Sequence, residues 1–120
     1  MEELTKVEER IMMIFWDLKK AFVKDVIARL NDEPKPPYST ISSVARILAA
    51  KGYLKYKVYG KTYEYYPAVS QLTYRKFKLK RILSGHFDDS PAELVSFLIK
   101  EEKLNKEEIR KLKDIINKIE

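Results

Sequence analysis

Hydroxyl-bearing and basic side chains that could bind a nucleic acid lie close together in residues 39–61. The first half of this segment carries small hydroxyls and one arginine, and the second half is rich in lysine and tyrosine. Hydroxyls reach phosphates or base edges, an arginine can pair bidentately with guanine, and lysines bind phosphates as point charges. The sequence therefore predicts DNA contact by Ser39, Thr40, Ser42, Ser43, Arg46, Lys55, Lys57, Tyr59 and Lys61.

Several of these residues also allow a purely structural interpretation. Ser39 stands where a helix could begin, so its hydroxyl can serve as a helix cap alone. Arg46 can be an ordinary solvated charge. Lys55 can pair with Glu64 on a neighbouring strand. These alternatives stay open at the level of the sequence.

The positive charge of the chain is concentrated in its middle. The net charge is +6, yet residues 35–86 hold eleven Lys or Arg and one acid, whereas each flank carries more acids than bases. Solubility alone needs no such segregation, so the pattern predicts a surface that faces phosphates. The dense basic run at residues 75–81 either flanks the DNA or forms a solvated helix face.

Residue types that would support catalysis or metal binding are scarce. The chain has no cysteine and a single histidine, His86, which excludes thiolate sites and a His cluster within one chain. No nucleophile–base pair and no phosphate-cradling glycine loop is evident, so we expect no catalytic residue, no metal and no cofactor. His86 lies beside Gly85 and is predicted to be a loop residue without a role.

The same inspection indicates where the protein works. No apolar run approaches the roughly 18 residues that cross a bilayer, and the acidic N-terminus is unlike a secretion signal. We therefore expect a cytoplasmic protein without a membrane partner.

Three helices are predicted ahead of the tyrosine-rich segment, over residues 5–18, 23–31 and 39–51. Thr5 and Glu8 form a capping box at the first, and Gly52 stands where a glycine ends the third. A loop with three prolines separates the second helix from the third. Trp16 ends an apolar helix and is expected in the core.

Residues 53–67 alternate with period 2, which predicts a hairpin. A two-residue turn at Tyr59-Gly60 is expected to pair Tyr56 with Tyr63 and Lys55 with Glu64. Tyrosines and aliphatic side chains then share one face, which we expect to pack on the helices. The remaining tip and lysine face are left for DNA: Tyr59, Gly60, Lys61 and Lys57.

Three more helices are predicted, at about 70–84, 91–103 and 105–119. Such short amphipathic helices lack a sufficient core of their own, so their apolar stripes need a partner. A second copy of the chain is the expected partner, and the alternative is packing on the chain's own N-terminal half. The predicted dimerisation residues are Leu72, Phe77, Leu94, Phe97, Leu98, Ile109, Leu112 and Ile116.

The order of elements predicts a mainly α fold with a small β-hairpin. Three helices and a hairpin make a winged helix-turn-helix over residues 1–69, with 39–51 as recognition helix and the hairpin as wing. Residues 70–120 form a helical dimerisation region. A dimer would place two recognition helices on two half-sites of one duplex.

The segments "LTKVEERIMMIFWD", "STISSVARILAAKGYLKYKVYGKTYEYYP" and "LVSFLIKEEKLNKEEIRKL" resemble the penicillinase-repressor (BlaI/MecI-like) family of transcriptional regulators. The resemblance runs from Leu4 to about Ile119. It implies a homodimeric repressor that binds a two-fold symmetric operator and blocks transcription.

The chain departs from the family pattern at three places. Ser42 and Ser43 replace a common Lys-Thr pair, and Arg46-Ile47 replaces Asn-Arg, so the family's operator does not carry over. Ser96-Phe97 stands where β-lactam-responsive members are cleaved between Asn and Phe. The cysteine cluster of copper-responsive relatives is absent. The inducing signal stays unknown.

Two other functions compete with a duplex-binding repressor. A single-stranded nucleic-acid or RNA binder would stack bases on wing tyrosines that project outward. A protein-interaction adaptor would keep the winged helix without DNA binding, although the basic centre of the chain argues against it.

Overall fold

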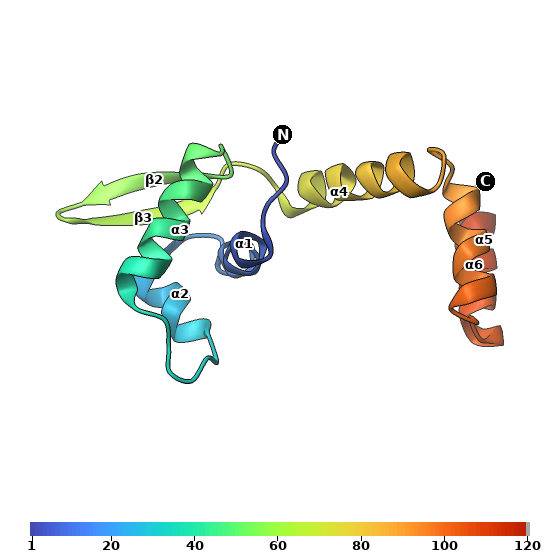
Figure 1. The fold of residues 1–120 in the computed structure, drawn as a ribbon, viewed down its shortest axis with the longest axis horizontal. Coiled ribbons are helices and arrows are strands. Elements are labelled where there is room, and N and C mark those ends of the chain that lie inside the picture. The colour runs from blue at the N-terminus through green and yellow to red at the C-terminus, as the bar shows by residue number, and fades with distance from the viewer. Residues whose placement is uncertain (120) are drawn as a thin grey trace. The chain divides into compact units, whose positions relative to one another are not determined.

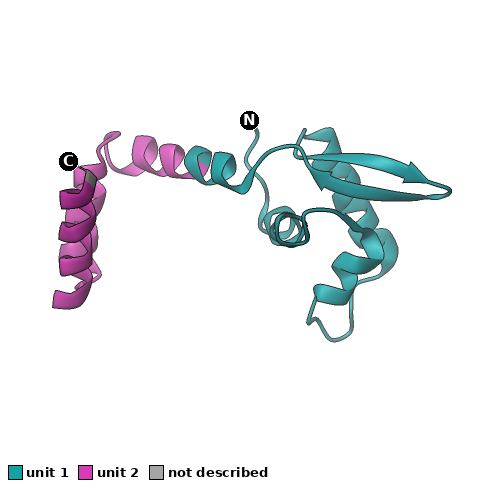
Figure 2. Ribbon diagram, turned by 180° about the vertical axis from the view of Figure 1, so that it is seen from behind, with its two compact units in different colours: residues 1–77 teal, residues 78–120 magenta. Residues whose placement is uncertain are grey.

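The computed structural model describes residues 1–119 and divides the chain into two compact units, Met1–Phe77 and Lys78–Glu120 (Figure 2). The boundary predicted between residues 69 and 70 separates two functions, DNA binding and dimerisation, rather than two compact units. It stays a prediction. The units are described one at a time.

Three helices build the first unit: α1 (Lys6–Leu18), α2 (Val23–Arg29) and α3 (Tyr38–Ala50) (Figure 1). The predicted capping box at α1 is confirmed. The Thr5 backbone N–H donates to Glu8 Oε1 over 3.0 Å, and the Glu8 N–H donates to Thr5 Oγ1 over 3.2 Å. Leu4, just before the cap, is buried and fixes how the chain enters the helix.

α3 ends as its sequence predicts. Gly52 has a φ of 86°, and the N–H of Tyr53 donates to the Leu48 carbonyl over 2.9 Å. The Gly52 N–H donates to the Ala49 carbonyl over 3.1 Å. These two bonds make a Schellman motif, which fixes the direction in which the chain leaves the helix.

A three-stranded antiparallel sheet follows, with order β1-β3-β2. β2 (Leu54–Tyr59) and β3 (Thr62–Pro67) form the wing, and β1 (Ala21–Phe22) pairs with β3. The sequence missed β1 because two residues are too few to show alternation. With it, the element order is that of the predicted winged helix-turn-helix.

The predicted hairpin register is wrong by two residues. The turn is Gly60-Lys61, so Tyr56 pairs with Tyr65, Val58 with Tyr63, and Lys57 rather than Lys55 with Glu64. A Tyr59-Gly60 turn of type I′ would need positive φ at a tyrosine. Gly60 instead takes the first central position with a φ of 59°, as in a type II′ turn. A shift of two residues preserves the faces of both strands.

The expectation that the wing tyrosines pack on the helices holds for only one of the three. Tyr65 is 2% exposed and meets the Phe15 ring edge-on at 5.9 Å. Tyr56 and Tyr63 are 49% and 41% exposed, and Val58 is also exposed. The hairpin extends beyond the helices, as Figure 1 shows, so its outer half has no core to cover.

α4 (Gln71–His86) begins in the first unit. Tyr74 is buried, its hydroxyl donates to Glu9 Oε2 over 2.7 Å, and its ring lies 5.4 Å from that of Trp16. Trp16 packs against the core, as expected, and donates from Nε1 to the Val69 carbonyl over 2.8 Å. Burial first, and then the bond to Glu9, raises the pKa of Tyr74.

The second unit contains the rest of α4 together with α5 (Pro91–Glu101) and α6 (Lys106–Ile119). Ser90 caps α5 by accepting the Glu93 N–H over 3.2 Å. The prediction of His86 as a loop residue is wrong, because α4 continues through it. None of the side chains described in residues 78–118 is buried.

A largely buried ion pair joins the start of α1 to the end of α3. Glu8 is only 8% exposed, and Lys51 Nζ lies 2.7 Å from Glu8 Oε1 and 3.0 Å from Glu2 Oε2. The hydrogen bond from Lys51 is the main cause that lowers the pKa of Glu8, against the opposing effect of burial. The hydrogen bond to Glu8 likewise raises the pKa of Lys51.

Replacing Glu8 should therefore destabilise the first unit. Glu8→Ala removes bonds from Thr5 and Lys51, and we expect the free energy of unfolding to fall by about 1.5–3 kcal/mol in urea denaturation at pH 7. Because the pKa of Glu8 is lowered on folding, its contribution exists above the ordinary value of 4.5 and disappears as the pH falls below it. The two proteins should thus converge in stability towards pH 3.

The control is Glu33→Ala, which removes an exposed carboxylate from the loop after α2 and should leave the unfolding midpoint nearly unchanged. A loss of stability in Glu8→Ala that stayed constant from pH 7 to pH 3 would contradict the assignment to an ion pair.

Candidate nucleic-acid interface

The exposed face of α3 carries the predicted contact residues. Ile41, Val44, Ala45 and Leu48 recur at helical spacing and are buried, so the opposite face is turned to solvent. Ser42 is half-buried at its edge. No side-chain hydrogen bond caps this helix and Pro37 occupies the cap position, so Ser39 does not act as the cap. The exposed members are Ser39, Thr40, Ser43 and Arg46.

The predicted wing residues are also exposed, but they divide between two sides. Lys55, Lys57 and Tyr59 share one face of β2, where Lys57 lies opposite Glu64 and Tyr59 meets the Phe22 ring at 5.8 Å. Lys61 lies in the turn and faces a cavity next to α3. The lysines of the wing are thus not equivalent.

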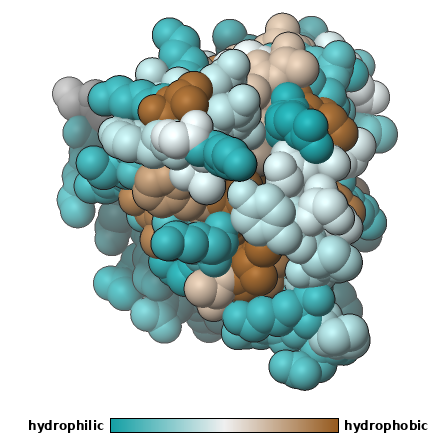
Figure 3. Space-filling view, turned by 90° about the vertical axis from the view of Figure 1, so that its left-hand side faces the viewer, coloured by the Kyte–Doolittle hydropathy of each residue, from teal (hydrophilic) through white to brown (hydrophobic). Residues whose placement is uncertain are grey.

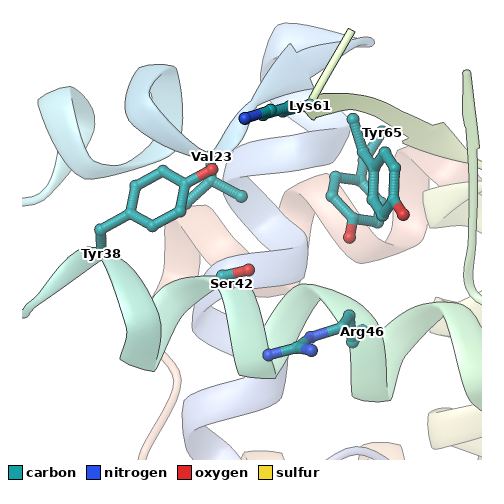
Figure 4. A pocket seen from close by; sticks show the side chains of 7 residues that line it. Val23, Tyr38, Ser42, Arg46, Lys61 and Tyr65 are labelled. Carbon is teal, nitrogen blue, oxygen red and sulfur yellow. The ribbon is translucent and has the colours of Figure 1, made fainter. Parts of the chain in front are cut away.

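The cavity between α3 and the wing has a volume of about 230 Å³. Arg46 approaches it from α3 and Lys61 from the wing, with the Tyr38 and Ser42 hydroxyls between them (Figure 4). Val23, Tyr63 and Tyr65 complete its lining, which contains no acid. Burial raises the pKa of Tyr65, and the neighbouring charge of Arg46 opposes that rise. Two cations therefore face one concave, acid-free space.

A stacked pair of tyrosines extends this surface outward along the wing. The rings of Tyr56 and Tyr63 lie 4.8 Å apart at an angle of 23°, and both contact Tyr65 at about 6 Å, with 5.8 and 6.2 Å between centroids. Beside the pair, Val58 is exposed. In the space-filling view, hydrophobic patches interrupt an otherwise largely hydrophilic face (Figure 3).

Sequence reasoning missed four exposed side chains of this region. Tyr38 and Ile47 project from α3, and Tyr56 and Tyr63 from the wing. The alternation of residues 53–67 assigned the tyrosines to a face without indicating how far the core reaches. Ile47 is 43% exposed on α3, the predicted recognition helix, where an aliphatic side chain could contact a thymine methyl group.

Two acids of the first unit, Asp17 of α1 and Asp32 of the loop after α2, are paired locally. Asp32 accepts from Arg10 and Asp17 accepts from Arg29, and both pairs are exposed to solvent. The hydrogen bond from Arg10 is the main cause that lowers the pKa of Asp32. Arg46 and Lys61, in contrast, face a cavity whose lining holds no carboxylate.

The described residues offer neither a metal site nor a membrane-spanning helix. Within residues 1–119, no group of three or more His, Asp or Glu side chains is arranged to hold a metal ion. In the same part of the chain, no helix is both long and apolar enough to cross a membrane.

The predicted dimerisation residues differ in their surroundings. Leu72 is exposed, and Phe77 packs against the core of the first unit. In the second unit, a groove of about 660 Å³ runs between α5 and α6, and Ile116 lines it. The Ser96–Phe97 bond lies within α5. Of the other predicted members, Phe97 and Ile116 are exposed, and Leu94, Leu98, Ile109 and Leu112 are half-buried.

Comparison with known proteins gives consistent results. Residues 4–118 match the family model described as penicillinase repressor. The methicillin resistance regulatory protein MecI of Staphylococcus aureus (strain N315) is 28% identical over 120 residues, which cover 97% of this chain and 94% of that protein. MecI of Staphylococcus epidermidis matches with the same identity and coverage.

Among solved structures, the complex structure of hsRosR-S4 aligns with a TM-score of 0.54 at 15% sequence identity. The alignment covers 85% of this chain and 91% of that chain, and at this identity it supports the fold alone.

The family match spans nearly the whole chain, and the first unit has the helices and hairpin of a winged helix. The chain therefore belongs to the penicillinase repressor family, a family of winged-helix, DNA-binding transcriptional repressors.

Proposed function

We propose that the chain is a homodimeric repressor that binds a specific, two-fold symmetric site in double-stranded DNA. The observation that carries the proposal is the combination of an exposed hydroxyl-rich face on α3 with an acid-free, two-cation cavity beside it. α3 is 13 residues long with its polar face exposed, which suits insertion into a major groove. The family membership also supports a DNA-binding repressor.

In this proposal the side chains of α3 divide the work of recognition. Ser39, Thr40 and Ser43 belong to the N-terminal half of the helix, the half that meets base edges in helix-turn-helix proteins. Arg46 and Ser42 border the cavity. The lysines Lys55, Lys57 and Lys61 contact phosphates, and Tyr59 contacts the backbone beside them. Phosphate contacts position the helix, and base contacts select the sequence.

The exposed tyrosine pair gives some support to the alternative, a binder of single strands. Base-stacking proteins offer free aromatic faces. Tyr56 and Tyr63 already cover one face of each other, at 4.8 Å between centroids, which reduces what they can offer to a base. Comparing the affinity for one sequence as a single strand and as a duplex separates the two functions.

The lack of buried side chains among residues 78–118 supports dimerisation through the second unit. Its apolar groove between α5 and α6 is larger than the cavity of the first unit and is lined by Val95, Ile99 and Ile116 among others. Apolar surface of this kind is stabilised by removal from water. A second copy, related by a two-fold axis, would cover it with the same surface.

MecI is a methicillin resistance regulator by name. The DNA target of MecI is not assigned to this chain, because four positions of α3 depart from the family pattern. The regulated genes must be found from the DNA that the protein selects.

The specific-repressor proposal predicts a strong preference among duplexes. We expect duplexes selected from a random pool to bind at least about 10³-fold more tightly than scrambled ones at physiological salt. Ser43→Ala should cost about 0.5–1.5 kcal/mol on the selected duplex, because one hydrogen bond is lost, and little on the scrambled one. Ser84→Ala is the matched control, and equal affinity for all duplexes would refute sequence-specific binding.

The dimer proposal predicts that one charge in the groove separates the subunits. Ile116 is exposed in the single chain, so Ile116→Glu should leave the first unit folded while it places a charge in the interface. We expect a monomer in sedimentation analysis and operator binding weaker by about 10²–10⁴-fold, because the two half-sites are no longer bound together.

Asn117→Glu is the matched control, since it adds the same charge at the next position of α6. It should remain dimeric. If Ile116→Glu were as dimeric as the wild type at micromolar concentration, the interface would lie elsewhere.

A further inference from the structure

We propose that the cavity between α3 and the wing is the seat of one backbone phosphate of the bound DNA strand, held jointly by Arg46 and Lys61. This inference rests on the proposed duplex binding and deepens it. It assigns to Arg46 a role different from the base reading that its sequence suggests.

The lining has the chemistry that a phosphodiester requires. Arg46 supplies a planar set of donors and Lys61 a point charge, and the two come from different elements of the fold. The Tyr38 and Ser42 hydroxyls are further donors on the α3 side (Figure 4). No acid lines the cavity. Two cations that face one acid-free cavity both attract an anion placed in it.

The size and position of the cavity also fit. Its volume of about 230 Å³ far exceeds the roughly 30 Å³ that one water occupies in the liquid. It opens between the helix that would enter the major groove and the hairpin beside that helix. In the proposed binding mode one strand of the duplex passes between these two elements, which brings its phosphates to this opening.

The tyrosine pair suggests what lies next to the phosphate. Tyr63 belongs both to the cavity lining and to the stack with Tyr56. The exposed parts of these rings, with the aliphatic Val58, make an apolar surface directly beside the seat. A deoxyribose carries the apolar groups that lie next to a backbone phosphate. The sugar adjoining the seated phosphate is therefore assigned to this surface.

Arg46 is pre-positioned for this role. It lines the same cavity as Lys61 and Tyr65, so its side chain lies on the wing side of α3. A base-reading arginine would instead extend away from the wing into the groove. The consequence is that Arg46 should contribute affinity to all duplexes rather than preference for one base pair.

The test is a scan of the selected duplex with single methylphosphonate linkages, which remove one phosphate charge at a time. For the wild type, one linkage in each half-site should weaken binding by about tenfold or more, as expected for loss of charge-assisted bonds. In Arg46→Gln and in Lys61→Gln that same linkage should lose most of its effect, to about twofold. Both side chains are exposed, so the substitutions should leave the fold intact, and thermal unfolding of each variant is the check.

Lys57→Gln is the matched control, because this lysine lies on the other face of the wing, opposite Glu64. It should leave the sensitive linkage as sensitive as in the wild type. Tyr56→Ala should weaken selected and scrambled duplexes alike, and Tyr56→Phe should not.

The possible outcomes distinguish the proposed phosphate site from the proposed repressor function. If the wild type shows no preference for the selected duplex, the repressor proposal fails before the scan begins. If the preference holds but Arg46→Gln and Lys61→Gln desensitise different linkages, or none, the shared seat is overturned and the repressor proposal stands. A changed base preference in Arg46→Gln, with the linkage still sensitive, would likewise overturn it.

Discussion

The carboxylate of Glu8 determines where α3 ends relative to α1, and the wing depends on that end. Glu8 accepts the N–H of Thr5 at the start of α1 and the ammonium of Lys51 at the end of α3. Gly52 then turns the chain, and β2 begins two residues later at Leu54. A displaced α3 would displace the wing with it. One nearly buried ion pair thus fixes, relative to α1, the end of α3 from which the wing starts.

The core that results is shorter than the hairpin it supports. Phe15, Leu54 and Tyr65 are buried, whereas the residues of β2 after Leu54 are exposed. Apolar surface exposed on a rigid hairpin beside a pair of cations is costly in water and useful at an interface. The aromatic side chains of the wing therefore have two functions. The inner ring stabilises the fold, and the outer rings form a surface.

A feature of the fold could be predicted from the sequence when the residues that determine it are close together in the chain. Thr5 and Glu8, or Gly52, act within a few residues, and the elements they delimit were predicted correctly. The position of the turn was predicted wrongly, because a turn at Tyr59-Gly60 and a turn at Gly60-Lys61 leave the same side chains on each face. Only the need for a positive φ at the first turn residue distinguishes the two. The exposure of Tyr56 depends on how far α1 and α3 reach, which no spacing within residues 53–67 encodes.

The second unit raises a different physical question, because its stability and its function would share one interface. Small helical units without buried side chains gain little from their own packing. If association supplies the missing burial, the fold of this unit depends on protein concentration by mass action. DNA binding would then be coupled to the same equilibrium, since the two half-sites bring the two copies together. In that arrangement any ligand that opened the groove lined by Ile99 and Ile116 would weaken operator binding without contacting α3 or the wing.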